Sequence, residues 1–253
     1  MPRWLAELPR RTFLLLMLAG SLFITAGSLA YFDPETLAPF VVEKLPLRFE
    51  TLWLWALRVH VASAALAFPL CLVLMTRVLQ RRPRWHRPLG RVAGVVLLGG
   101  LVPSGSVLAF SAKGGWAGSA GFLLSGAIIA AAVVLGVLAA RRGDLVTHRH
   151  AMLHVVGQMS VAVSSRALIV GFDRAGFDPD VAYVVALWGP VLASAAVAEL
   201  AAARFDFARL RRSLVSRAAL SFLLPSKGIS REISTMALVV RVRSVRSVAR
   251  SGR

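Results

Sequence analysis

The stretch THRHAMLHVV, residues 147–156, holds three of the five histidines of this chain: His148, His150 and His154. His150 and His154 are four residues apart, so on a helix their side chains face the same way, whereas His148 faces elsewhere. Two imidazoles at this spacing can ligate a metal ion. The sequence places no carboxylate beside them, because Asp144 lies outside the expected helix. We therefore predict no metal site here.

The other two histidines belong to different segments. His86 lies in the arginine-rich connection RRPRWHRPLGR, on the same side of the membrane as His150 and His154. One interpretation is a shared site of these three residues, and the other is a solvated cluster at the membrane interface. A bis-histidine haem needs two ligands at similar depth on facing helices. The outer side offers only His60, so a second ligand is missing there. The inner side has enough histidines, although two of them lie at or outside the interface, so haem b stays an open alternative.

The composition decides the class of protein to which these residues belong. The chain has 253 residues, of which 57% are hydrophobic and 17% charged, whereas soluble domains carry about 25% charged residues. Several apolar runs of about twenty residues predict an all-α, polytopic transmembrane helical bundle. The single cysteine, Cys71, excludes an internal disulfide, and the absence of CxxC motifs excludes zinc ribbons, iron–sulfur clusters and covalently attached haem.

About six membrane spans are expected, with a four-helix core formed by the second to the fifth. At 1.5 Å per residue, each is long enough to cross a hydrocarbon core of roughly 30 Å. We divide the chain into a first span with an outer loop (1–50), the four-helix core (51–172), a sixth span (173–203) and a basic tail (204–253). The predicted spans are Thr12–Phe32, Leu52–Leu79, Leu89–Ala112, Gly118–Ala140, His150–Phe172 and Val181–Ala203.

Positive charge alternates along the connections and predicts the orientation. Arginines gather at the N-terminus, in the second and fourth connections and in the tail, which has eleven Arg and one Lys against two acidic residues. This pattern places both termini in the cytoplasm of a bacterial inner membrane. We expect the tail to attract anionic lipids rather than nucleic acid. The first span follows a twin-arginine pair, Arg10 and Arg11, but its apolar run is longer than that of a secretory signal, so we expect it to stay uncleaved.

Ionisable groups within spans are costly and therefore candidates for function. Arg58 and His60 in the second span and Arg166 in the fifth lie toward the outer side, where they could line one polar pocket. The alternative is that both arginines extend to the interface. Glu199 is the only carboxylate within a span and lies near its cytoplasmic end. Because an acidic proton relay and broken helices are lacking, a small transporter is the weakest hypothesis.

The order of several motifs is similar to a known family. The segments VHVASAALAFPLCLVLMTRVLQRRPRWHRPLGRVAG, FSAKGGWAGSAGFLLSG and ARRGDLVTHRHAMLHVV resemble the bacterial predicted membrane proteins called domain of unknown function 2306, over about Arg58 to Leu168. In that family a tryptophan stands at the position of Ala151 and an arginine at that of His154. The family's motif positions correspond here to His60, His86, Arg87, Gly90, Arg91, His148, Arg149, Met152 and Arg166.

The resemblance implies that two His-Arg pairs, His86 with Arg87 and His148 with Arg149, form one unit across two cytoplasmic connections. Such a cationic rim suits an anionic headgroup, a quinone oxygen or a haem propionate. The first functional hypothesis is therefore a membrane redox protein that binds haem b or quinone. The alternative is a non-catalytic membrane protein that binds lipid or a small ligand. No catalytic residue is assigned.

Overall fold

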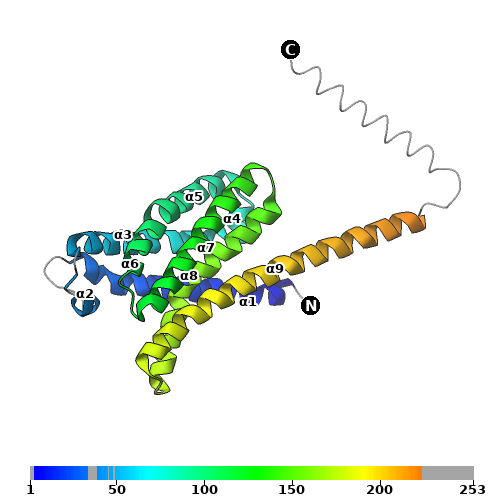
Figure 1. Ribbon diagram of the computed structural model, residues 1–253. Coiled ribbons are helices and arrows are strands. Elements are labelled where there is room, and N and C mark those ends of the chain that lie inside the picture. Colours follow the sequence, from blue (N-terminus) through cyan, green and yellow to red (C-terminus); the bar gives the residue numbers. More distant parts are fainter. Residues whose placement is uncertain (1–2, 34–38, 45, 48, 224–253) are drawn as a thin grey trace, which may run out of the picture. The chain divides into compact units, whose positions relative to one another are not determined.

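The computed structural model describes residues 3–33, 39–44, 46–47 and 49–223, and side chains within 8–203 except at 34–40, 45 and 48. The chain forms two units, residues 1–201 and 202–253, and the packing given below is that of the first. Regular structure in the described residues is helical throughout (Figure 1). In chain order the helices are α1 (Arg3–Gly27), η1 (Ser28–Phe32), α2 (Pro39–Lys44), α3 (Glu50–Leu74), α4 (Arg77–Gln80), α5 (Pro83–Val96), η2 (Leu97–Leu101), α6 (Val102–Ala109), α7 (Gly115–Arg141), α8 (Leu145–Arg174) and α9 (Pro179–Leu223).

Among the described residues, six helical stretches are long and apolar enough to cross a membrane. Each corresponds to one of the six predicted spans, so the predicted all-α, six-span fold is confirmed. The six stretches are Leu8–Phe32, Glu50–Leu74, Pro83–Ala109, Gly115–Arg141, Leu145–Arg174 and Pro179–Ala203.

Several span boundaries differ from the predicted ones, and local residues explain the end of the second span and the start of the third. The second span ends at Leu74 rather than Leu79, because the extended backbone of Thr76 separates α3 from the short helix α4. The third span begins at Pro83 rather than Leu89. Proline is favourable in the first turn of a helix, where its missing N–H would have no partner in any case.

The main core lies between the second, third, fourth and fifth spans. Buried side chains from all four form one apolar cluster, which includes Phe68, Leu97, Val133 and Val155. The first span packs against this cluster from outside, through Leu14, Met17 and Leu18. α7 and α8 lie side by side in Figure 1 and pack along much of their length. The core therefore brings the histidine-bearing helices α3, α5 and α8 together.

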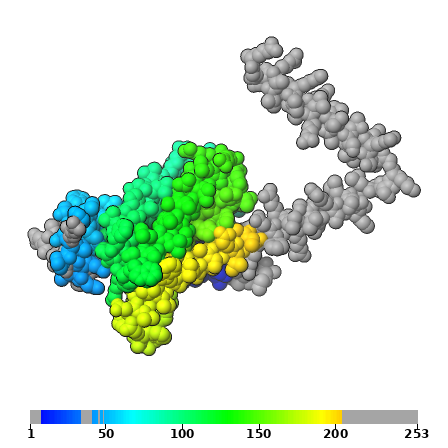
Figure 2. All heavy atoms as spheres, viewed as in Figure 1, coloured from blue at the N-terminus to red at the C-terminus, as the bar shows by residue number. Residues whose placement is uncertain are grey.

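Apolar side chains also cover the outside of the bundle. No more than a third of the most apolar window of any candidate span is buried, and large side chains such as Leu15, Phe23, Val95 and Leu135 are exposed. The outer surface of this bundle is seen in Figure 2. A soluble protein rarely exposes so much contiguous apolar surface, so the bundle is built to lie in lipid.

The third span is not one regular α-helix. A π-helix, Leu97–Leu101, joins α5 to α6 and includes Gly99 and Gly100. The α-carbon of Gly100 packs against the side chain of Ser63 in α3, and a methyl group at this position would overlap the Ser63 hydroxyl. The π-helix thus lets the third span approach α3 next to His60.

One end of the bundle is rich in arginine. This charge is carried by α4 and the connection after it, by the first three turns of α5, by the end of α7 and its connection to α8, and by the first turns of α8. We call this the arginine-rich end; its exposed arginines are Arg77, Arg81, Arg82, Arg84, Arg87, Arg91, Arg141, Arg142 and Arg149.

Candidate functional site

The first turn of α8 decides how its three histidines are presented. Asp144 Oδ1 accepts hydrogen bonds from two backbone N–H groups of that turn, at 3.2 and 3.1 Å, and so caps the helix. The helix begins at Leu145, whereas the predicted span began at His150. His148 therefore lies within the helix and faces away from His150 and His154, since two residues turn a helix by about 200°.

His148 points toward α5 and α7. Its Nδ1 lies 2.9 Å from the carbonyl oxygen of Gly136, and because a carbonyl only accepts, Nδ1 is the donor. The His148 ring meets the His86 ring edge-on, with centroids 6.4 Å apart and planes at 81°. Nδ1 of His86 is buried and has no hydrogen-bond partner in the described part of the chain. We call His86 and His148 the rim pair.

His150 and His154 point toward α9, where they meet Glu199. His154 Nε2 lies 2.9 Å from Glu199 Oε1 and 3.2 Å from His150 Nε2. His150 Nε2 lies 3.3 Å from the same carboxylate oxygen. The exposed fractions of the side chains are 16% for His154, 33% for His150 and 64% for Glu199, so the cluster is open on the carboxylate side. We call these three residues the His-His-Glu cluster.

One turn further along α8, a buried amide joins the same two helices. Gln158 Nε2 donates to the carbonyl oxygen of Val191 and to Ser194 Oγ, both at 3.0 Å. Beyond it, Val161 packs with Leu187 and Val191. His150, His154, Gln158 and Val161 therefore lie on the face of α8 that contacts α9.

The three polar groups predicted for the outer side have separate partners. Arg58 Nε donates to the carbonyl oxygen of Tyr31 at 3.1 Å. His60 Nδ1 lies 3.3 Å from the carbonyl oxygen of Leu101, at the end of the π-helix. Arg166 donates to a carbonyl one turn back on its own helix, at 2.8 Å. A pocket shared by Arg58, His60 and Arg166 stays a prediction.

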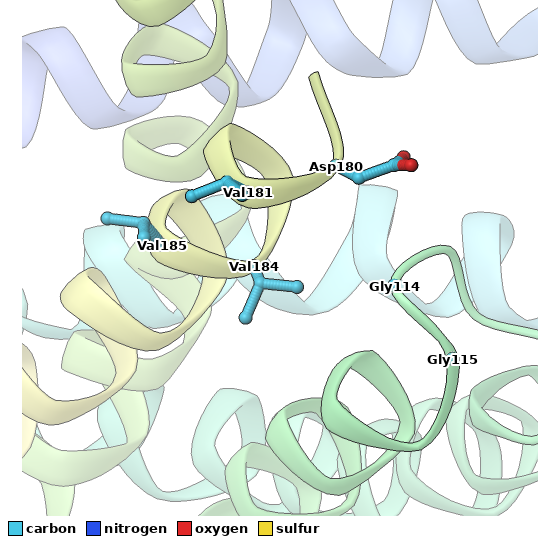
Figure 3. Close-up of a pocket in the computed structure, with 6 residues that line it drawn as sticks. All are labelled: Gly114, Gly115, Asp180, Val181, Val184 and Val185. Carbon is cyan, nitrogen blue, oxygen red and sulfur yellow. The ribbon is translucent and has the colours of Figure 1, made fainter. Parts of the chain in front are cut away.

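An open pocket lies at the start of α9, where that helix passes the turn before α7. Its lining is apolar apart from one carboxylate: Gly114, Gly115, Asp180, Val181, Val184 and Val185. Figure 3 shows Val184 pointing into the space beside the glycine turn and Asp180 pointing away from the valines. Gly114 has a φ of 81°, which favours glycine, and a methyl group here would come within 2.8 Å of Val184. With one polar side chain that points outward, the pocket offers little chemistry.

Comparison with family models finds a match to "Predicted membrane protein (DUF2306)" over residues 57–202. The chain belongs to this family. Comparison with curated proteins finds no match, and comparison with solved structures finds none either. The family-matched segment thus runs beyond Leu168, where the resemblance was expected to end, and takes in the sixth span. It contains all five histidines and Glu199, and it excludes the first span and the basic tail.

Within this DUF2306 segment the histidines fall into groups that differ from the predicted site of His86, His150 and His154. His86 contacts His148, and the unit of two His-Arg pairs stays a prediction. His150 and His154 instead contact Glu199 on the next helix. His60 lies apart from both groups, against the π-helix.

Glu199 is the residue that reasoning from the sequence missed as a partner of the histidines. The expectation that no carboxylate lies beside His150 and His154 is wrong, because Glu199 is distant in the sequence but close in the fold. A signal was available: a short connection makes α8 and α9 antiparallel neighbours. His154 lies twenty residues before Arg174, the last residue of α8, and Glu199 lies twenty residues after Pro179, the first residue of α9.

Proposed function

We propose that this DUF2306 membrane protein binds an anionic ligand, such as a phospholipid headgroup, at its arginine-rich end. The observation that carries the proposal is the edge-on contact of His86 with His148, whose ring centroids lie 6.4 Å apart. This contact joins the start of α5 to the start of α8. Each histidine is followed by an exposed arginine, Arg87 or Arg149. The two His-Arg pairs thereby present donors from two helices to one region.

The surroundings favour an anion at this position. α5 and α8 both begin here, and the N-terminal end of a helix favours negative charge. Asp144, the acidic residue nearest the rim pair in sequence, is occupied in capping α8. Trp85, beside His86, is 53% exposed, and tryptophan is enriched at the level of lipid headgroups. We infer that the arginine-rich end faces the cytoplasm, where anionic lipids are concentrated.

The test compares the thermal stability of the purified full-length protein in mixed micelles with phosphatidylglycerol, with phosphatidylcholine and with inorganic phosphate. We expect stabilisation by phosphatidylglycerol over phosphatidylcholine, and its loss in the double variant Arg87→Gln/Arg149→Gln. Arg174→Gln, an exposed arginine at the end of α8, is the matched control. Stabilisation by inorganic phosphate alone would identify a free anion as the ligand. Equal losses in the double variant and the control would mean that net charge, and not the rim, attracts the lipid.

The second candidate is the redox function, with haem b or quinone as the ligand. One observation favours it: the ring centroids of His86, on α5, and His148, on α8, lie 6.4 Å apart at the same end of the bundle, and bis-histidine ligation needs two imidazoles at similar depth. A reduced-minus-oxidised visible spectrum of protein expressed with added haem tests it. We expect a b-type α-band that disappears in His148→Ala if haem binds. A featureless spectrum would exclude the haem form and leave quinone, whose oxygen would accept a hydrogen bond from the rim.

A further inference from the structure

The His-His-Glu cluster brings three lone-pair atoms to one point. Nε2 of His150, Nε2 of His154 and Oε1 of Glu199 lie 2.9–3.3 Å from one another. All three atoms are acceptors when each imidazole carries its single proton on Nδ1 and the carboxylate is ionised. Acceptors at such short range repel one another unless a positive charge lies between them. The cluster therefore calls for a proton or a metal cation.

The spacing of the three atoms matches one face of a tetrahedral metal site. Bonds of about 2.0–2.2 Å to nitrogen and oxygen, arranged as a tetrahedron, put neighbouring ligand atoms roughly 3.3 Å apart. The separations between the two nitrogens, 3.2 Å, and between His150 and Glu199, 3.3 Å, agree with this value. The third, 2.9 Å, is shorter by an amount that a small rotation of the exposed carboxylate would correct.

The two helices that carry the ligands are fixed relative to each other beside the cluster. The Gln158 amide bonds α8 to α9 through Val191 and Ser194. The adjacent Gly157 lets the helices approach closely, since a methyl group there would come within 3.2 Å of the Ser194 side chain. His154 and Gln158 lie one turn apart on α8. The ligand geometry is therefore held in place by contacts that involve none of the ligands.

The outer surroundings of the cluster set a limit on affinity. Ligation through Nε2 leaves the proton of His154 on Nδ1, which is buried and has no partner among the described residues. Losing the outer hydrogen bond of a metal-bound histidine typically weakens metal affinity about 10- to 100-fold. We expect binding that is weaker by this factor than in a site where both rings are anchored.

We propose that His150, His154 and Glu199 bind one divalent transition-metal ion, with zinc the best match to two imidazoles and a carboxylate in tetrahedral geometry. The fourth position faces the open side of the cluster, where Glu199 is 64% exposed. A ligand from outside the chain would complete the coordination there. The site is separate from the rim pair and does not depend on the anionic ligand proposed for it.

The competing explanation is a hydrogen bond in which a histidine that carries its proton on Nε2 donates to Glu199. The experiment measures zinc bound per chain by equilibrium dialysis of the full-length protein in detergent, after treatment with a chelator, using zinc chloride alone. We expect one zinc ion per chain in the wild type. We expect zinc affinity to fall at least 10-fold in Glu199→Gln and in His154→Gln. Glu50→Gln, an exposed carboxylate at the start of α3, is the matched control and should leave zinc affinity unchanged.

Two results would overturn the proposal. One is a wild type that binds no zinc at this stoichiometry, which would leave the hydrogen bond between histidine and Glu199 as the explanation. The other is zinc affinity that survives in both Glu199→Gln and His154→Gln, which would place the metal elsewhere in the chain. Because Glu199 is largely exposed, its variant is expected to fold. Size-exclusion elution and the thermal melt in the absence of zinc check this for each variant.

Discussion

Glu199 Oε1 lies 2.9 Å from His154 Nε2, although forty-five residues separate the two in the sequence. They meet because α8 and α9 form a helical hairpin with a short connection, in which residues equally far from the turn lie at the same depth. His150, one turn from His154, joins them. A cation bound by these three residues would link the fifth span to the sixth.

Zinc should stabilise the folded protein measurably. A ligand that binds only the folded state at about 100 times its Kd adds about 2.7 kcal/mol to the free energy of unfolding. Thermal unfolding in mild detergent, with and without zinc, measures this as a rise in Tm. Glu199→Gln should show no rise. A rise of the same size with Mg²⁺, which prefers oxygen ligands, would contradict a site built on two imidazoles.

The sequence predicted the six spans well because lipid imposes a simple rule: about twenty apolar residues per span. It predicted the boundaries less well where single residues decide them. Asp144 caps α8, so this helix begins at Leu145 and not at the predicted His150. The π-helix at Leu97–Leu101 includes Gly100, which lies against Ser63 in another span, and no local pattern reveals such a contact.

The candidate site followed the sequence only in part. The i,i+4 spacing correctly placed His150 and His154 on one face, because helix geometry alone determines this. Their partner Glu199, and the contact between His86 and His148, depend on which helices are neighbours. The first could have been inferred from the short connection between the fifth and sixth spans. The second required knowing that the starts of α5 and α8 lie close together, which follows from the assembled bundle.

The buried amide of Gln158 should contribute to the stability of the α8–α9 contact. Replacing it in Gln158→Leu removes two interhelical hydrogen bonds at 3.0 Å. Hydrogen bonds between membrane helices average about 0.6 kcal/mol and reach about 1.7 kcal/mol, so a loss in this range is expected in unfolding by denaturing detergent. Gln80→Leu is the control, since Gln80 is exposed and should change stability by less than about 0.5 kcal/mol. Equal effects would show that the interhelical bonds contribute nothing.

Gly100 should not tolerate a side chain while Ser63 keeps its hydroxyl. Gly100→Ala forces a methyl group onto Ser63 Oγ across the contact between α3 and the π-helix. Overpacking of this kind costs about 1–3 kcal/mol. The double variant Gly100→Ala/Ser63→Ala removes the overlapping oxygen and should recover most of the loss. Gly99→Ala, where a methyl group would meet nothing within 4 Å, is the control. A double variant no more stable than Gly100→Ala would show that the π-helix itself, and not the overlap, needs glycine.

Salt should separate the two proposed binding functions. The exposed arginines of the arginine-rich end act on an anionic headgroup through charge that salt screens: the Debye length falls from about 10 Å at 0.1 M to about 3 Å at 1 M. Stabilisation by phosphatidylglycerol should therefore fall steeply over this range.

Zinc held by His150, His154 and Glu199 at bonding distance should keep most of its affinity, since its ligands touch the ion and two of the three side chains are at most one third exposed. Titrating lipid and zinc in parallel at both salt concentrations checks this. If salt weakens lipid binding and zinc binding to the same extent, zinc is bound by diffuse surface charge, and the cluster does not coordinate it.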